Sequence, residues 1–534
     1  MLHASQVTLP IRTRFCSDKK IIWLEFIQEQ ITKPLRGDFE NMFLSCYDYL
    51  VGVMYMMNSD TIAAVATALS DSGIGIVRIS GPDAIKVADS IFYTKNGKRK
   101  LKNVDSHTIH YGYIVDCKEE SEVLPQDWQN LIIDEVMAAV MKAPKSYTME
   151  DTVEINCHGG VLVIQKVLET VIRHGARLAE PGEFTKRAFL NGRIDLSEAE
   201  AVIDVIHSQN EFALHSSISQ LKGNLSEKIR RLREEIIYEI AFIESALDDP
   251  EHISLDGYQH ELENKVTGLC EEISKLIDTA DNGRMIKEGI KTVIVGKPNA
   301  GKSSLLNLLV GEERAIVTDI AGTTRDVLEE SIKLHGISLQ VIDTAGIRNT
   351  EDIVEKLGVE KAKKYAKEAE LILYVVDTSV SLDDSDKEII SLIEDKNAII
   401  LLNKSDLTAL VKEKDLENLI EGLVPGHKKL AMIHTSTKDN TGMELFENTV
   451  MDMFFHGNLK SNHQLVITSL RHKEALQNAL DSLNMVKKSI ENQMPEDFYS
   501  IDLMSAYTSL GFIIGEEVDD DLVQVIFSKF CMGK

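Results

Sequence analysis

The run GKPNAGKS occupies positions 296–303 and has the spacing of a phosphate-binding loop. It follows the apolar run KTVIVG and opens the run SSLLNLLV, which gives the strand–loop–helix context that such a loop requires. Gly296 and Gly301 allow the backbone N–H groups to face phosphate. Lys302 can reach the β- and γ-phosphates, and Ser303 offers a hydroxyl to Mg²⁺. The run therefore predicts a site for a nucleoside triphosphate and Mg²⁺.

Two further runs predict contacts to the terminal phosphate and the metal. GTTRD at 322–326 supplies Thr324, which suits Mg²⁺ and the γ-phosphate. DTAG at 343–346 ends an apolar strand-like run, and it places the Asp343 carboxylate near Mg²⁺ and the Gly346 N–H near the γ-phosphate.

Two later runs predict that the base is guanine. NKSD at 403–406 provides Asp406, whose carboxylate can accept from both N1–H and the 2-amino group of guanine, a donor pair that adenine lacks. TSTK at 435–438 fits the last base-contacting loop, although related GTPases usually carry alanine where Thr437 stands. The predicted GTP-binding residues are Asn299, Ala300, Gly301, Lys302, Ser303, Ser304, Thr318, Asp319, Ile320, Ala321, Gly322, Thr323, Thr324, Asp343, Thr344, Ala345, Gly346, Asn403, Lys404, Asp406, Ser436, Thr437 and Lys438.

The residue after DTAG is Ile347, where Ras-type GTPases carry the glutamine that orients the attacking water. Hydrolysis therefore needs another organiser of the water and another cation. Arg325 and Arg348 are candidate cations, although switch arginines also serve as ordinary ion pairs. A monovalent cation held in part by the Asn299 side chain is the other candidate.

Periodicity divides the chain into regions that must position these loops. Strand-like and helical segments alternate over 57–190, and residues 195–287 have the three- and four-residue apolar spacing of helices. Short apolar strands alternate with helices over 289–453, and 462–530 is helical again. We expect an α/β plus all-α protein in which a Ras-like P-loop domain is inserted into a helical domain.

The composition of the chain limits the partners that it can bind and indicates its cellular compartment. The 534 residues carry 58 basic and 85 acidic side chains, a net charge of −27, which disfavours stand-alone binding to nucleic acid except through basic runs such as 95–102 or 185–193. The six cysteines form no CxxC pair, so we expect neither disulfides nor zinc. Within the run CHGG at 157–160, His158, Gly159 and Gly160 are interpreted as a turn and helix entry. No apolar run is long enough to span a membrane, and a reducing cytoplasm is expected.

Longer stretches resemble the bacterial MnmE (TrmE) tRNA-modification GTPases. They are GKPNAGKSSLLN, IVTDIAGTTRDV, IDTAGIR, PGEFTKRAFLNGRIDLSEAEAVIDVI and the terminal CMGK. The resemblance begins near residue 57. The simplest hypothesis for the preceding extension is that translation starts at Met56 or Met57, and a targeting or regulatory role of residues 1–56 is the alternative. The resemblance implies an α+β folate-binding and dimerisation domain at 57–190 and a first helical part at 191–287. The G domain follows at 288–453 and a second helical part at 454–534. Residues 1–56 are unassigned.

The resemblance also implies the missing catalytic groups. In that family K⁺ sits beside the nucleotide and acts like an arginine finger, and the matching ligands here are Asn299, Thr318, Ile320 and Thr323. A glutamate shortly after DTAG positions the water, and its match is Glu355. The structural alternative is that Glu355 is an exposed carboxylate at the start of a helix, where the helix dipole favours a negative charge.

The resemblance also implies a second site, formed by residues from the first part and from the C-terminal tail of the matching region. The family's folate-contacting positions match Arg78, Glu154, Arg193 and Lys534, although lysine is commoner at the third of these. The resemblance implies that the tail lies near that folate site and that Cys531 is a catalytic residue, taking part in chemistry or positioning there. Taken singly, each charged residue could be an ordinary surface ion pair, and the cysteine could be incidental.

The implied function is addition of a carboxymethylaminomethyl or aminomethyl group to C5 of the tRNA wobble uridine. The implied cofactors are GTP, Mg²⁺, K⁺ and a tetrahydrofolate derivative. The implied partners are a second copy of the chain and an FAD-using protein, MnmG, in a heterotetramer. The alternative is a stand-alone regulatory or ribosome-assembly GTPase, which folate binding would distinguish.

Overall fold

The structure, a computed structural model, falls into two compact units, Met1–Glu200 with Ile514–Lys534 and Ala201–Ile513. Among its described residues, no helix is long and apolar enough to cross a membrane. Those residues are 60–98, 101–116, 128–253, 255, 257–311, 330–334, 336–342, 364–425, 430–455, 465–516, 520–530 and 533.

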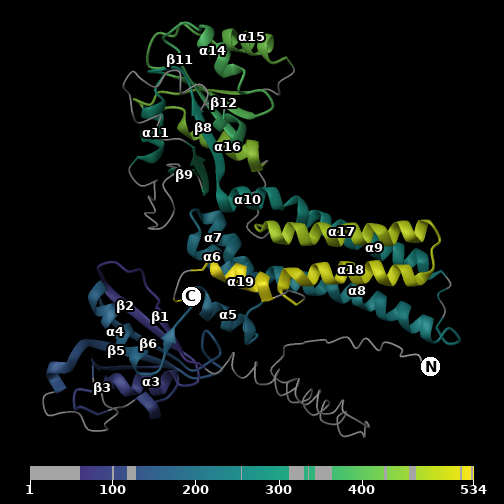
Figure 1. Ribbon diagram of the computed structural model, residues 1–534. Helices are drawn as coiled ribbons and strands as arrows, with labels where there is room; N and C mark the ends of the chain where they lie inside the picture. The colour runs from purple at the N-terminus through teal and green to yellow at the C-terminus, as the bar shows by residue number, and fades with distance from the viewer. Residues whose placement is uncertain are drawn as a thin grey trace, which may run out of the picture. The chain divides into compact units, whose positions relative to one another are not determined.

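The first unit is built on a seven-stranded sheet of order β3-β4-β5-β6-β2-β1-β7. Helices α3 and α4 cover one face and enclose the apolar core (Figure 1). Because side chains alternate along a strand, Ile79 and Val153 enter that core, whereas Arg78 and Glu154 lie opposite each other on the other face. The elements are β1 (Ile62–Val65), β2 (Ser72–Ser80), α3 (Ala84–Ile91), β3 (Phe92–Tyr93), β4 (Thr108–Val115), β5 (Ile132–Met141), β6 (Thr152–Gly159), α4 (Val161–Arg173) and β7 (Arg177–Leu178).

The CHGG run corrects one local prediction. Strand β6 continues through His158 and Gly159, and only Gly160 is the N-cap residue of α4. The strand continues because the His158 backbone N–H and the Nδ1 atom both bond the Asp134 carboxylate on neighbouring β5.

Helix α19 (Asp520–Ser528) packs on α5 (Glu183–Leu190) within the same unit. The Phe189 and Phe527 rings lie 6.2 Å apart. Gly182, with φ of +70°, precedes α5, and a Cβ there would lie 2.4 Å from the Phe527 carbonyl oxygen. This close approach brings the C-terminal segment to the N-terminal sheet.

Helix α5 also changes the interpretation of the basic run at 185–193. Arg187 is only 5% exposed and pairs with Asp60, Glu150 and Glu183, with N–O distances of 2.7, 3.2 and 2.9 Å. Its charge is used inside the unit, so at this position the run is not an open surface for RNA.

The second unit contains long helices whose apolar residues recur at helical spacing, such as Ile229, Leu232 and Ile236 of α8. Figure 1 shows α9 beside α17. Helices α8 and α18 meet where the Arg233 guanidinium lies 3.9 Å from the Tyr507 ring centroid. The helices are α6 (Leu196–His207), which begins in the first unit, α7 (Glu211–Leu221), α8 (Asn224–Asp248), α9 (Tyr258–Asp278), α10 (Ala280–Glu288), α17 (Leu470–Glu491) and α18 (Glu496–Ile514).

Between α10 and α17 lies a six-stranded sheet of order β13-β12-β11-β8-β10-β9, parallel except for the β9–β10 pair. Buried clusters lie on both of its faces, as a parallel sheet requires. The predicted insertion of an α/β unit between helical segments is confirmed. Its elements are β8 (Ile290–Val295), α11 (Lys302–Val310), β9 (Glu330–Leu334), β10 (Ile337–Val341), β11 (Leu371–Asp377), α14 (Asp384–Ile390), β12 (Asn397–Asn403), α15 (Glu413–Leu423), β13 (Ala431–His434) and α16 (Met443–Phe455).

Candidate functional site

The P-loop turns tightly between β8 and α11, and two glycines make that turn possible. Gly296 has φ of +154° and Gly301 has φ of +103°, values that L side chains rarely adopt. A Cβ on Gly296 would lie 2.4 Å from the Val375 carbonyl oxygen, and one on Gly301 would lie 2.1 Å from Asn403 Nδ2. The loop therefore packs directly on the ends of β11 and β12.

Lys302 begins α11, and its ammonium lies inside the loop. Nζ donates to the carbonyl oxygens of Gly296 and Lys297, both at 2.7 Å. Burial lowers the pKa of Lys302. The ammonium is thus held at the N-terminus of a helix, where an anion is favoured by the backbone N–H groups and the helix dipole.

Asn403 ties the P-loop to the base-binding loops. Its Nδ2 donates to the Ala300 carbonyl at 2.9 Å, and its Oδ1 accepts from the Thr437 backbone N–H at 3.4 Å. The neighbouring Lys404 has φ of +60°, and its ammonium donates to Asp377 at 2.6 Å. One buried amide thus holds the two loops together.

Asp406 is exposed at the same edge of the sheet and accepts from Ser436 Oγ at 3.1 Å. Ser436, Thr437 and Lys438 follow β13 after a single intervening residue, Thr435. The carboxyl ends of β8, β12 and β13 therefore bring the P-loop, NKSD and TSTK together, which is where open α/β sheets bind ligands.

The predicted metal ligands are only partly within the described residues. Ser303 lies in the first turn of α11 beside Lys302, and its hydroxyl suits a hard cation such as Mg²⁺. Asn299, the predicted K⁺ ligand of the P-loop, has φ of +61°. Described residues contain no group of three or more His, Cys, Asp or Glu side chains that could hold a metal. The predicted residues outside them are Thr318, Asp319, Ile320, Ala321, Gly322, Thr323, Thr324, Asp343, Thr344, Ala345, Gly346, Glu355, Cys531 and Lys534.

Three of the predicted folate positions, Arg78, Glu154 and Arg193, lie close together, whereas Lys534 is outside the described residues. Arg78 Nε donates to Glu154 at 2.8 Å, and its Nη1 donates to the Gly533 carbonyl at 3.1 Å. Both the Arg78 and the Arg193 guanidinium groups lie over the Tyr147 ring, at 5.5 and 4.5 Å from its centroid. Residues from β2, β6, the segment after α5 and the C-terminal tail thus form one cationic site with a single bonded carboxylate.

Two residues that contact the candidate sites were not predicted from the sequence. Tyr147 carries no charge, and only its aromatic character just before β6 could have drawn notice. Lys297 occupies a variable position of the P-loop motif, yet its ammonium lies 2.8 Å from the Asp386 carboxylate, which is 1% exposed. Tyr374 also donates to Asp386, at 2.6 Å. A basic residue inside the loop motif was the only signal for this contact.

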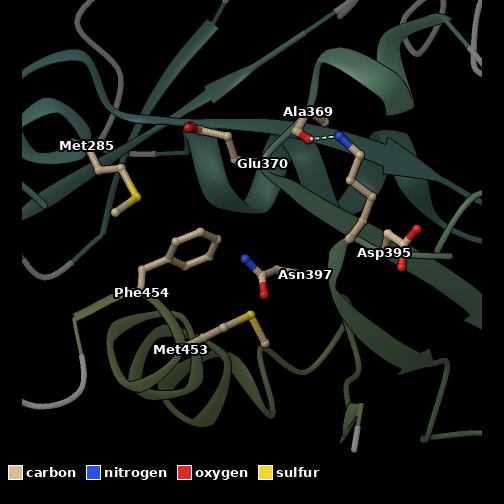
Figure 2. A pocket seen from close by; sticks show the side chains of 8 residues that line it. Met285, Ala369, Glu370, Asp395, Asn397, Met453 and Phe454 are labelled. Carbon is tan, nitrogen blue, oxygen red and sulfur yellow. Dashed lines mark hydrogen bonds between the residues drawn. The ribbon is translucent and has the colours of Figure 1, made fainter. Parts of the chain in front are cut away.

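A shallow hollow of about 400 Å³ lies elsewhere in the second unit (Figure 2). Glu370 and Asn397 stand at the amino ends of β11 and β12, and Met285 and Phe454 from α10 and α16 border the hollow. The hollow is thus at the opposite edge of the sheet from the P-loop, and it is not the nucleotide site.

The sheet and the loops at its carboxyl edge define a P-loop GTP-binding domain with helical segments on either side of it in the chain. A profile of the MnmE helical domain matches residues 196–531, and one of the GTP-binding protein TrmE N-terminus matches residues 61–193. The chain belongs to the MnmE family of tRNA modification GTPases, and it is a GTP hydrolase.

Relatives match this chain along their full length. The tRNA modification GTPase MnmE of Lachnoclostridium phytofermentans is 59% identical over 478 residues, covering 90% of this chain and 100% of that protein. Those of Alkaliphilus oremlandii and Clostridioides difficile are 46% and 47% identical, with the same coverage. The G domain of the T. maritima FeoB iron transporter is 24% identical and covers 30% of this chain and 97% of that chain, but its TM-score of 0.23 adds nothing to the assignment.

Proposed function

We propose that this chain works in the cytoplasm with an FAD-dependent MnmG-type partner to add a carboxymethylaminomethyl or aminomethyl group to C5 of the tRNA wobble uridine. Hydrolysis of GTP would depend on K⁺, and a tetrahydrofolate derivative would supply the one-carbon unit. The bond from Arg78 to the Gly533 carbonyl carries this proposal. A GTPase that acts alone has no need to join its C-terminal tail to a cationic site on a separate sheet.

The first-unit site suits a folate by its charges. A folate carries an N–H edge on its pterin ring and carboxylates on its glutamate tail. Glu154, held by Arg78, can accept from the N–H edge, while Arg193 and Lys534 can pair with the carboxylates. The Glu154 side chain is 24% exposed and that of Arg78 is 14% exposed, so both are accessible at the rim of the site.

The second-unit site suits GTP hydrolysis assisted by two metal ions. Ser303 and Thr324 would hold Mg²⁺, and Asn299, Thr318, Ile320 and Thr323 would hold K⁺. Both cations would neutralise charge on the phosphates in the transition state. Glu355 would orient the attacking water in place of the glutamine that Ile347 replaces. Cys531 would act near the folate site.

The net charge of −27 bears on the partners. Binding of tRNA requires a basic surface, and in this proposal the FAD protein supplies most of it within a heterotetramer. A homodimer formed through the N-terminal domain would be the core of that assembly.

Nucleoside mass spectrometry on tRNA from cells with and without the gene tests the proposed function. Loss of the C5-aminomethyl family of wobble uridines on deletion, restored by the intact gene but not by an Arg78→Gln variant, is the expected result. An unchanged nucleoside profile would refute the tRNA substrate and favour a stand-alone regulatory or ribosome-assembly GTPase. In that case the purified chain should also fail to bind folate.

A further inference from the structure

Tyr147 lies between the two arginines of the first-unit site. The Arg193 Cζ atom is 4.5 Å from its ring centroid and the Arg78 Cζ atom is 5.5 Å away, both within the range of a cation–π interaction. Arg78 is also bonded to the Glu154 carboxylate. Among the described residues, the Tyr147 ring is the group over which the Arg193 guanidinium lies.

The ring itself is rigidly supported. Its hydroxyl lies 2.9 Å from Thr185 Oγ1, and Thr185 is fully buried in α5. The ring also packs against the buried cluster of Ile62, Ala64, Ala179 and Phe184. Such a ring can orient a long side chain that is otherwise free to turn in solvent.

We propose that Tyr147 is a positioning residue of this site, and that its ring holds the Arg193 guanidinium ready for a ligand carboxylate. An exposed arginine loses rotamer entropy when it binds an anion, and a guanidinium already held on a ring face loses less. The N–H groups at the edge of the guanidinium remain available for a two-point bond to carboxylate. The inference rests on the folate site proposed above, and the carboxylates meant are those of the folate glutamate tail.

Calorimetric titration of the full-length chain with 5-formyltetrahydrofolate, a chemically stable folate, tests this role. Tyr147→Leu should weaken binding about fivefold, whereas Tyr147→Phe, which keeps the ring, should bind within about twofold of the wild type. If the ring acts through Arg193, the double variant Tyr147→Leu/Arg193→Gln should bind no more weakly than Arg193→Gln alone. Unchanged affinity in Tyr147→Leu, or two independent losses in the double variant, would overturn the inference.

A second measurement avoids any loss of fold. Fluorinated phenylalanine at position 147 keeps the shape of the ring but withdraws charge from its face, so affinity should fall stepwise as fluorines are added. If folate affinity does not change as fluorines are added, the cation–π role of the ring is refuted. A wild-type chain that binds no folate would instead refute the folate site itself, and GTP affinity would confirm that each variant is folded in its second unit.

Discussion

Asp406 is the carboxylate predicted to select guanine as the base. It stands exposed beside the P-loop edge and accepts a hydrogen bond from Ser436 Oγ. Asp406→Asn leaves only one acceptor for the two guanine N–H groups, so affinity for GTP should fall about 100-fold or more. Affinity for xanthosine triphosphate should rise, because its C2 carbonyl accepts from the new amide. Competition with a fluorescent guanine nucleotide measures both changes.

The matched control for this variant is Asp395→Asn. Asp395 lies at the opposite edge of the same sheet and has φ of +62°, which asparagine tolerates. If Asp395→Asn weakened GTP binding as much as Asp406→Asn, the assignment of Asp406 to the base would be wrong.

The buried cluster around Arg187 predicts acid sensitivity of the first unit. Burial alone would raise the pKa of Glu183 and Asp60, but bonds from Arg177 and Arg187 outweigh it and hold both pKa values below their usual range. Carboxyl groups with depressed pKa values stabilise the fold at neutral pH. That contribution is lost as pH falls below about 5 toward the folded-state pKa values.

Denaturation followed by the fluorescence of Trp128, in a Trp23→Phe background, would measure this dependence in the first unit. Arg187→Met should destabilise the unit by about 3 kcal/mol or more at pH 7 by leaving buried carboxylates uncompensated. Its stability should vary less with pH than that of the parent. A parallel pH dependence in the two proteins would contradict the role given to Arg187.

At the scale of elements, Gly182 governs how α19 docks on α5. Gly182 and Gly192 both have positive φ, +70° and +74°, but a Cβ meets the Phe527 carbonyl only at Gly182 and meets nothing within 4 Å at Gly192. Alanine at either position costs about 1 kcal/mol in backbone strain. Gly182→Ala should cost more, and hydrogen exchange in α19 should rise in that variant alone. Equal exchange in both variants would contradict this account of the docking.

Lys297 links the P-loop to the N-terminus of α14. Its ammonium contacts Asp383 and Asp386, and its own backbone carbonyl holds Lys302. Lys297→Met should weaken nucleotide binding about fivefold by loosening the loop, since a buried charge-assisted bond is lost. Lys387→Met is the control, because it removes a 2.7 Å pair with Asp384 on the same helix that is exposed to solvent. Equal affinities of the two variants would contradict the link.

At the scale of the whole molecule, we expect GTP hydrolysis to require K⁺, because Ile347 stands where Ras-type GTPases carry the glutamine that orients the attacking water. Replacing KCl by NaCl at equal ionic strength should lower GTP turnover at least about tenfold. The reason is that K⁺ would provide the transition-state stabilisation that an arginine finger provides in other GTPases. Asn299→Ala should abolish the difference between the two salts. Equal rates in both salts for the wild type would refute the K⁺ site while leaving the GTP site intact.

The sequence by itself predicted the loop motifs of the nucleotide site, and it determined the insertion of an α/β unit between helical segments. Each loop motif is local: a few residues between a strand and a helix dictate both the turn and the groups that it presents. Gly296, Lys302, Asn403 and Asp406 lie at one edge of the sheet. The alternation of strands and the spacing of helical apolar residues likewise follow from local backbone geometry.

Only the tertiary structure decided which distant residues meet. Arg78 bonds Gly533 across 455 positions, Tyr147 supports Arg193, and Lys297 reaches Asp386. No local period encodes such contacts, because they depend on how whole elements pack. Burial is equally non-local: Arg187 belongs to a basic run in the sequence, yet the packing of α5 makes it the centre of an internal ion cluster.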